Sequence, residues 1–216
     1  MFIGHNAVGF ASKRAAPRTS LGWLMAAPQL LDLIWPILLV LGVEHVRIAP
    51  GNTRFTPLDF YDYPWSHSLL MSIVWGALFA LAYFAKTRYA AGATTLFIGV
   101  VSHWLFDFFT HRADMPLYPG GPRVGLGLWN HPAATVIVEA ILFAIGIAIY
   151  LRTTRARDKT GVYALWSLIV FLVIIYIAAA KGPPPPDVKT LAVTAFAAYL
   201  FPLWAMWIDR HREVVR

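Results

Sequence analysis

The sequence predicts an all-α membrane protein, a polytopic bundle of about six transmembrane helices with both termini in the cytoplasm. Three observations predict this class. The 216 residues are 58% apolar and only 13% charged, which is too few charges to cover a water-facing surface. The apolar residues fall into six long runs. The chain also has no cysteine, which excludes a disulfide-stapled domain and thiolate metal sites.

Each of the six runs has the roughly 20 mostly apolar residues that a helix needs to cross the hydrocarbon core of a bilayer. The predicted spans are residues 20–43, 66–86, 90–111, 132–151, 161–180 and 188–208. They form a single integral membrane domain over residues 1–216, with a cytoplasmic or re-entrant segment at 1–19, four spans and the proposed site in 20–151, and two further spans in 161–208. The proline run at 183–186 is typical of a stiff connector between the last two spans.

The basic residues divide unequally between alternate loops. Twelve Lys and Arg residues lie at the two termini and in the loops after the second and fourth spans, and six lie in the other loops. Loops rich in Lys and Arg face the cytoplasm, so the loops after the first, third and fifth spans are expected on the outer side. A formal charge of +7 can indicate nucleic-acid binding, but here the basic residues lie in short clusters between the apolar runs, which membrane orientation explains better. We therefore expect membrane lipids rather than nucleic acid as partners.

Titratable side chains inside the spans are few, and they are functional candidates because such groups are costly in a bilayer. They come from four of the predicted spans: Asp32, His67, His103, Asp107, His111 and Glu139. The spacing of four between His103, Asp107 and His111 leaves all three within about 80° on one face of a helix. A rise of about 1.5 Å per residue brings the whole set to the middle and outer half of one bundle.

Imidazoles and carboxylates without thiolates are the ligands of hydrolytic zinc, manganese or iron sites. The expected ligands of a divalent metal ion, with zinc first and manganese or iron as alternatives, are His67, His103, Asp107 and Asp32. We expect His111 to act as a further ligand or a proton donor, and Glu139 as the general base. A buried hydrogen-bond network that only joins the helices is the alternative interpretation.

The motifs resemble the YdjM-like family of membrane-bound proteins, which are classed as metal-dependent hydrolases. The matching elements cover roughly residues 1–115 and are the early His5, Asp32, the run Ser66-His67-Ser68-Leu69-Leu70, and Ser102-His103 with Asp107. The resemblance implies an integral protein of the bacterial inner (plasma) membrane. It also adds His5 to the candidate metal ligands. His5 reaches the other candidates only if residues 2–12 rise into the membrane as a re-entrant helix.

The order of these residues is also similar, at a more distant level, to that of all-helical zinc-dependent phospholipases C. That pattern places its final His and Glu four residues apart, whereas His131 and Glu139 are eight apart, so we expect one or two ions rather than three. The predicted function is hydrolysis by metal-activated water, with an amphipathic lipid ester or phosphoester as the substrate. A transporter or channel for a divalent ion or proton, and a non-catalytic membrane scaffold, are the two alternatives.

Overall fold

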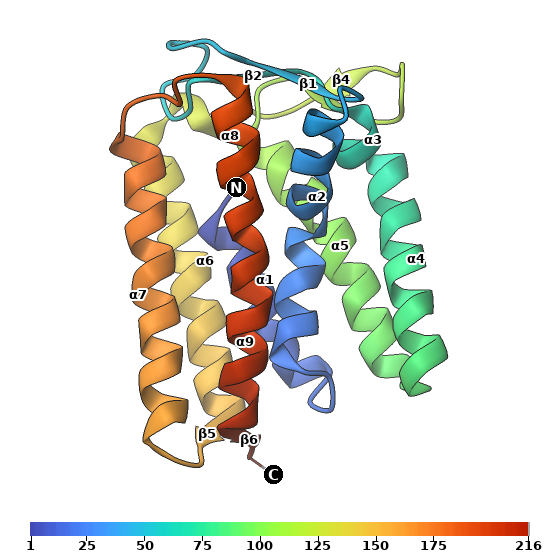
Figure 1. Cartoon of the computed structure of the whole chain (residues 1–216), viewed down its shortest axis with the longest axis vertical. Helices are drawn as coiled ribbons and strands as arrows, with labels where there is room; N and C mark the ends of the chain where they lie inside the picture. Colours follow the sequence, from blue (N-terminus) through green and yellow to red (C-terminus); the bar gives the residue numbers. More distant parts are fainter. Residues whose placement is uncertain (216) are drawn as a thin grey trace.

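Long apolar helices that run roughly parallel make up most of the structure (Figure 1). The computed structural model describes residues 1–215. Within these residues, six helical stretches are long and apolar enough to cross a membrane: α2 (Leu21–Val40), α4 (Leu69–Thr87), α5 (Ala90–Thr110), α6 (Pro132–Thr153), α7 (Lys159–Lys181) and the stretch Val188–Arg210. The last consists of α8 (Val188–Ala195), the 3-10 turn η2 (Phe196–Tyr199) and α9 (Leu200–Arg210). The predicted all-α class and the six spans are confirmed.

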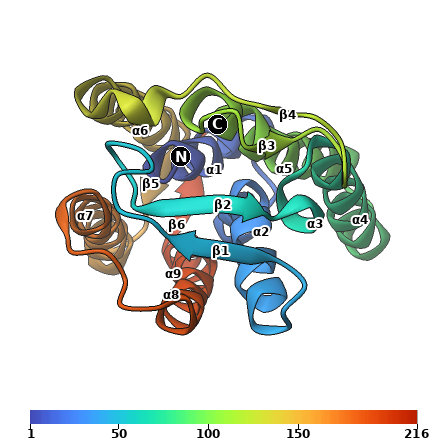
Figure 2. The same ribbon diagram turned by 90° about the horizontal axis from the view of Figure 1, so that it is seen from above.

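The first residues of the chain form a further helix, α1 (Ile3–Ala15), which lies in the middle of the bundle (Figure 2). It packs most extensively on α6, and also on α2 and α5. Close approach is possible because glycines stand at the contacts. A Cβ added at Gly146 of α6 would meet the carbonyl oxygen of Ala7, and one added at Gly9 would lie 3.0 Å from the Met25 Cα atom.

Short strands and turns close the two ends of the bundle (Figure 1). One end carries the antiparallel hairpin of β1 (His45–Ile48) and β2 (Leu58–Asp62), the short helix α3 (Pro64–His67), the pair β3 (Met115–Pro116) and β4 (Arg123–Val124), and the 3-10 turn η1 (Leu128–Asn130). The opposite end carries β5 (Thr154–Ala156) paired with β6 (Arg212–Val214), beside the C-terminus. The loops after the first, third and fifth spans therefore share one end, which we call the outer end, although the orientation in the membrane stays a prediction.

The distribution of side chains is that of a membrane protein. Large apolar residues are exposed on the sides of the bundle, among them Leu81, Ile98, Ile141, Val170 and Leu203. In the interior, a cluster that includes Phe10 of α1, Phe143 and Leu168 is buried. Polar side chains are buried as well, among them His5 and Asn6 in the first half of α1.

Candidate metal centre

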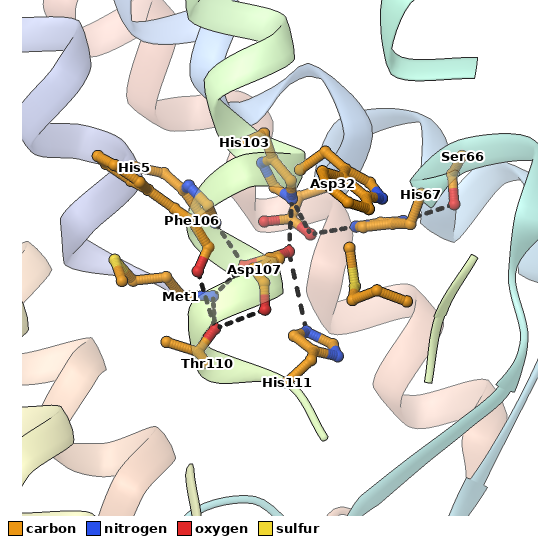
Figure 3. A network of polar contacts seen from close by, with 12 residues as sticks. Met1, His5, Asp32, Ser66, His67, His103, Phe106, Asp107, Thr110 and His111 are labelled. Atoms are coloured by element: carbon orange, nitrogen blue, oxygen red, sulfur yellow. Dashed lines mark hydrogen bonds and ion pairs between the residues drawn. The ribbon is translucent and has the colours of Figure 1, made fainter. Parts of the chain in front are cut away.

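The predicted ligands meet where α1, α2, α3 and α5 come together. Figure 3 shows the side chains that converge there: His5, Asp32, His67, His103, Asp107 and His111. The four imidazoles and Asp107 are at most 4% exposed, whereas the Asp32 side chain is 35% exposed and lines a cavity. His67 lies in α3 rather than at the start of the second span, because Ser68 caps the next helix by accepting a hydrogen bond from the Met71 N–H.

Asp107 stands at the centre of the cluster. Its Oδ1 atom lies 3.0 Å from His5 Nε2, and its Oδ2 atom lies 3.0 Å from His103 Nε2 and 3.8 Å from His111 Nε2. The spacing on α5 explains this, since residues four apart lie above one another on a helix. The ammonium group of Met1 also contacts Asp107 Oδ1.

Asp32 approaches the same group of imidazoles from α2. Its Oδ1 atom lies 3.4 Å from His67 Nε2 and 3.9 Å from His103 Nε2. Two sets of three ligand atoms, each within 4.8 Å of one another, could hold a metal ion: His5, His103 and Asp107, and Asp32, His67 and His103. Because one nitrogen lone pair binds one ion, His103 can serve only one of these positions at a time.

Two of the imidazoles are held from behind by groups that only accept hydrogen bonds. His103 Nδ1 lies 2.7 Å from the carbonyl oxygen of Pro28, and His111 Nδ1 lies 3.0 Å from Asp114 Oδ1. In the neutral ring, the proton therefore sits on Nδ1, and Nε2 presents a lone pair to the carboxylates. His103 Nε2 is fully buried and has no hydrogen-bond partner among residues 1–215.

Asp114 and Tyr63 are site residues that the sequence reasoning missed. The Tyr63 hydroxyl donates to Asp114 Oδ1 at 3.2 Å and lies 3.3 Å from His111 Nδ1. Burial raises the pKa of the Tyr63 phenol well above its ordinary value, and the nearby Asp114 charge raises it further, so the hydroxyl keeps its proton. The short spacing from His111 to Asp114 is the only signal in the sequence that could have found this pair.

Glu139 of α6 contacts the beginning of α1. Its Oε2 atom accepts hydrogen bonds from the backbone N–H groups of Phe2 at 2.8 Å and Gly4 at 3.2 Å. A carboxylate at this position satisfies free N–H groups of the first turn and interacts favourably with the helix dipole. The Oε1 atom is buried and has no hydrogen-bond partner among residues 1–215.

A cavity of about 170 Å³ extends from the cluster toward the outer end. Its polar lining comes from Asp32, His67, Asp107, His111 and Glu139. Its aromatic lining comes from Phe2, Trp35, Phe55, Phe60, Trp129 and Tyr176. The hairpin β1–β2 lies across this end of the bundle (Figure 2), and its Phe60 ring packs 5.1 Å from the His111 ring. The cavity is therefore polar at its base and aromatic at its sides.

Six apolar spans define an integral membrane protein. Its bundle encloses a cluster of imidazoles and carboxylates. The family model described as YdjM inner membrane protein matches residues 64–183, more than half of the chain, and the chain belongs to this family. The match confirms the resemblance seen in the sequence and, with the apolar helices, an integral protein of the inner membrane. No curated protein and no solved structure was found to match the chain.

The family match covers most of the predicted site. Residues 64–183 include His67, His103, Asp107, His111 and Glu139. His5 and Asp32 lie before the matched range, and the structure brings both to the same cluster. His45 and His211 lie apart from it, and each pairs at 2.8 Å with an exposed carboxylate, Asp62 and Asp158 respectively.

Proposed function

We propose that the protein is a membrane-embedded metal-dependent hydrolase whose His and Asp cluster holds a divalent ion. The observation that carries the proposal is the state of His103. Its Nδ1 atom is committed to the Pro28 carbonyl, and its buried Nε2 atom lies 3.0 Å from Asp107 Oδ2 with no hydrogen-bond partner among residues 1–215. A lone pair and a carboxylate that face each other in a buried site repel unless a cation or proton lies between them.

The separations between the facing atoms fit a metal ion. Two ligand atoms that are each about 2.1 Å from a tetrahedral ion lie about 3.4 Å apart. The distance from His67 Nε2 to Asp32 Oδ1 is 3.4 Å, and the distances to Asp107 range from 3.0 to 3.8 Å. The Met1 ammonium contacts Asp107 and balances one carboxylate charge of the cluster, and a divalent ion would also balance the charge of Asp32. Zinc suits this ligand set first, with manganese and iron as alternatives.

When bound, such an ion supplies Lewis acidity, which lowers the pKa of water and polarises a substrate carbonyl or phosphoryl oxygen. The ligands would be His5, Asp32, His67, His103 and Asp107. His111 is farther from Asp107 and lines the cavity, where it can bind the ion or give a proton to the leaving group. Glu139 can use its free Oε1 atom as the general base, while Oε2 keeps α1 in place.

The cavity supports an amphipathic substrate. Its aromatic sides suit an apolar portion, and its polar base suits an ester or phosphoester group. The bundle is surrounded by lipid, so a lipid ester or phosphoester is the substrate class we propose. A transporter is less well supported, because fully buried apolar side chains such as Phe10, Leu21 and Met25 fill the bundle between the cluster and the opposite end.

The test is the metal content and activity of the detergent-purified protein beside matched variants. The parent should retain zinc and cleave at least one member of a panel of lipid esters and phosphoesters. His103→Ala should lose both, whereas His45→Ala, which alters an exposed histidine outside the cluster, should lose neither. Full retention of metal in His103→Ala would disprove the metal site. Ion flux in liposomes without any bond cleavage would instead favour the transporter.

A further inference from the structure

Two buried residues, Glu44 and Ser66, lie behind His67. His67 Nδ1 lies 2.6 Å from Ser66 Oγ, on the side of the ring away from Asp32 (Figure 3). Ser66 Oγ donates in turn to Glu44 Oε2 at 2.6 Å. The other carboxylate oxygen of Glu44 accepts hydrogen bonds from the backbone N–H groups of Trp65 and Ser66, both at 2.7 Å. Glu44 is 1% exposed and Ser66 is fully buried, so this arrangement is shielded from water.

His67 differs from His103 and His111 in the kind of partner behind it. The partner of His103 is a carbonyl, which can only accept. The partners of His111 are the Asp114 carboxylate and the Tyr63 hydroxyl, whose hydrogen is donated to Asp114. A serine hydroxyl can either donate or accept, so by itself it leaves the tautomer of His67 open. The carboxylate of Glu44 removes this freedom, because it takes the only hydrogen of the hydroxyl. Ser66 Oγ must then accept a hydrogen bond from Nδ1–H.

We infer that Glu44, acting through Ser66, fixes His67 in the tautomer whose Nε2 atom can bind a metal ion. The inference rests on the proposed function, since it assigns Glu44 and Ser66 as positioning residues for a proposed ligand. Without the carboxylate, Ser66 can donate to Nδ1, and the proton moves to Nε2. That nitrogen then donates to Asp32 Oδ1, which lies 3.4 Å away, and no longer offers a lone pair.

The path of the chain explains how one segment controls both sides of the imidazole. Helix α2 carries Asp32 to the front of His67 and ends at Val40. The chain then turns at Gly42, which has a φ of 68°, and brings Glu44 to the back of the same ring. The first turn of α3 presents its N–H groups to Glu44, so the carboxylate also holds the segment that carries His67.

The experiment measures zinc affinity by chelator competition on the full chain in detergent. Ser66→Ala and Glu44→Gln should each weaken zinc binding by on the order of 10–100-fold, the usual cost of losing a group that orients a ligand. Ser66→Thr keeps the hydroxyl and should bind zinc like the parent. The matched control is Asp62→Asn, which removes a carboxylate 2.8 Å from the exposed His45 and should have no effect.

A second readout separates positioning from general damage to the fold. Nitrogen-15 NMR of the metal-free protein, with the His67 signals identified by comparison with His67→Ala, reports which ring nitrogen carries the proton. The parent should show the Nδ1–H form, and Glu44→Gln should shift His67 toward Nε2–H while His103 keeps its tautomer. Ser66→Ala leaves the backbone hydrogen bonds to Glu44 in place, so it serves the same purpose if Glu44→Gln does not fold.

The outcomes distinguish the inference from the proposed function. If His103→Ala binds zinc as tightly as the parent, the proposed metal site is wrong, and the inference fails with it. If only His67→Ala binds like the parent, the ion is held by His5, His103 and Asp107, and the inference alone fails. If His67→Ala loses zinc while Ser66→Ala and Glu44→Gln bind like the parent and keep the Nδ1–H form, only the inference is overturned. Weaker binding in both variants, together with a changed tautomer, supports it.

Discussion

The contact between Glu139 and the start of α1 predicts a measurable effect on the stability of the central helix. Glu139→Ala removes two hydrogen bonds to a carboxylate, a partly buried one from the Phe2 N–H and a buried one from the Gly4 N–H. Such bonds contribute about 1.5–3 kcal/mol each, so the local cost is about 3 kcal/mol at the lower limit. That free energy corresponds to a roughly 100-fold larger population in which the start of α1 is open. Glu139→Gln keeps an acceptor oxygen and loses only the charge. Its cost is about 1 kcal/mol, which corresponds to a roughly fivefold larger population of the open start of α1.

Amide hydrogen exchange of the α1 peptide, measured by mass spectrometry on the detergent-purified protein, tests these magnitudes. The exchange rate of residues 3–7 should rise in the order parent, Glu139→Gln, Glu139→Ala. Glu213→Ala is the control, since it removes an exposed carboxylate that pairs with Arg155 at the opposite end of the bundle. Exchange of α1 that is unchanged in Glu139→Ala would refute the anchoring role. It would also leave general-base chemistry as the only role for this carboxylate.

Four further results are expected. Tyr63→Phe keeps the ring contacts but removes the hydroxyl donated to Asp114, so thermal unfolding in detergent should show a loss of about 1 kcal/mol, and no loss would contradict the hydrogen bond. Gly146→Val should expel α1 and yield aggregated protein on size-exclusion chromatography, whereas Ala148→Val, at an exposed position of the same helix, should elute normally. A cysteine at Leu126, which is 62% exposed at the outer end, should react with an impermeant thiol reagent in intact cells. A cysteine at Arg155, at the opposite end, should react only after lysis, and the opposite pattern would invert the predicted orientation. Zinc at about 100 times its dissociation constant should stabilise the protein by about 2.7 kcal/mol in thermal unfolding and should not stabilise His103→Ala.

Hydropathy was sufficient to find the spans, because a bilayer imposes a length and an apolar composition on any helix that crosses it. The same signal could not place α1. Its 13 residues are too short to span a bilayer, and they include polar side chains such as His5 and Asn6. The position of α1 depends on contacts between distant parts of the chain, such as Ala7 against Gly146, and hydropathy contains no information about these contacts.

The proposed metal ligands could be predicted from the sequence, whereas the residues that orient them could not. His103 and Asp107 are related by helical spacing, so the sequence alone placed them on one face. Glu44 follows the first span next to the exposed His45, and nothing in its local sequence separates a buried acceptor from a solvated loop residue. Its partner Ser66 lies 22 residues further along the chain, and only the folded structure brings the two together. Glu139 was found from its depth in a span, but its hydrogen bonds to α1 were not foreseen.

X-ray absorption spectroscopy at the zinc edge of the purified, zinc-loaded protein tests whether the buried cluster binds the metal ion. A zinc ion held by these side chains should show a first shell of nitrogen and oxygen atoms at about 2.0–2.1 Å, with the outer-shell scattering of at least two imidazole rings. His103→Ala should reduce the bound zinc, and any zinc that remains should show weaker imidazole scattering. A parent spectrum without imidazole scattering, or one that is identical in His103→Ala, would contradict the assignment of the buried His and Asp cluster as a metal centre.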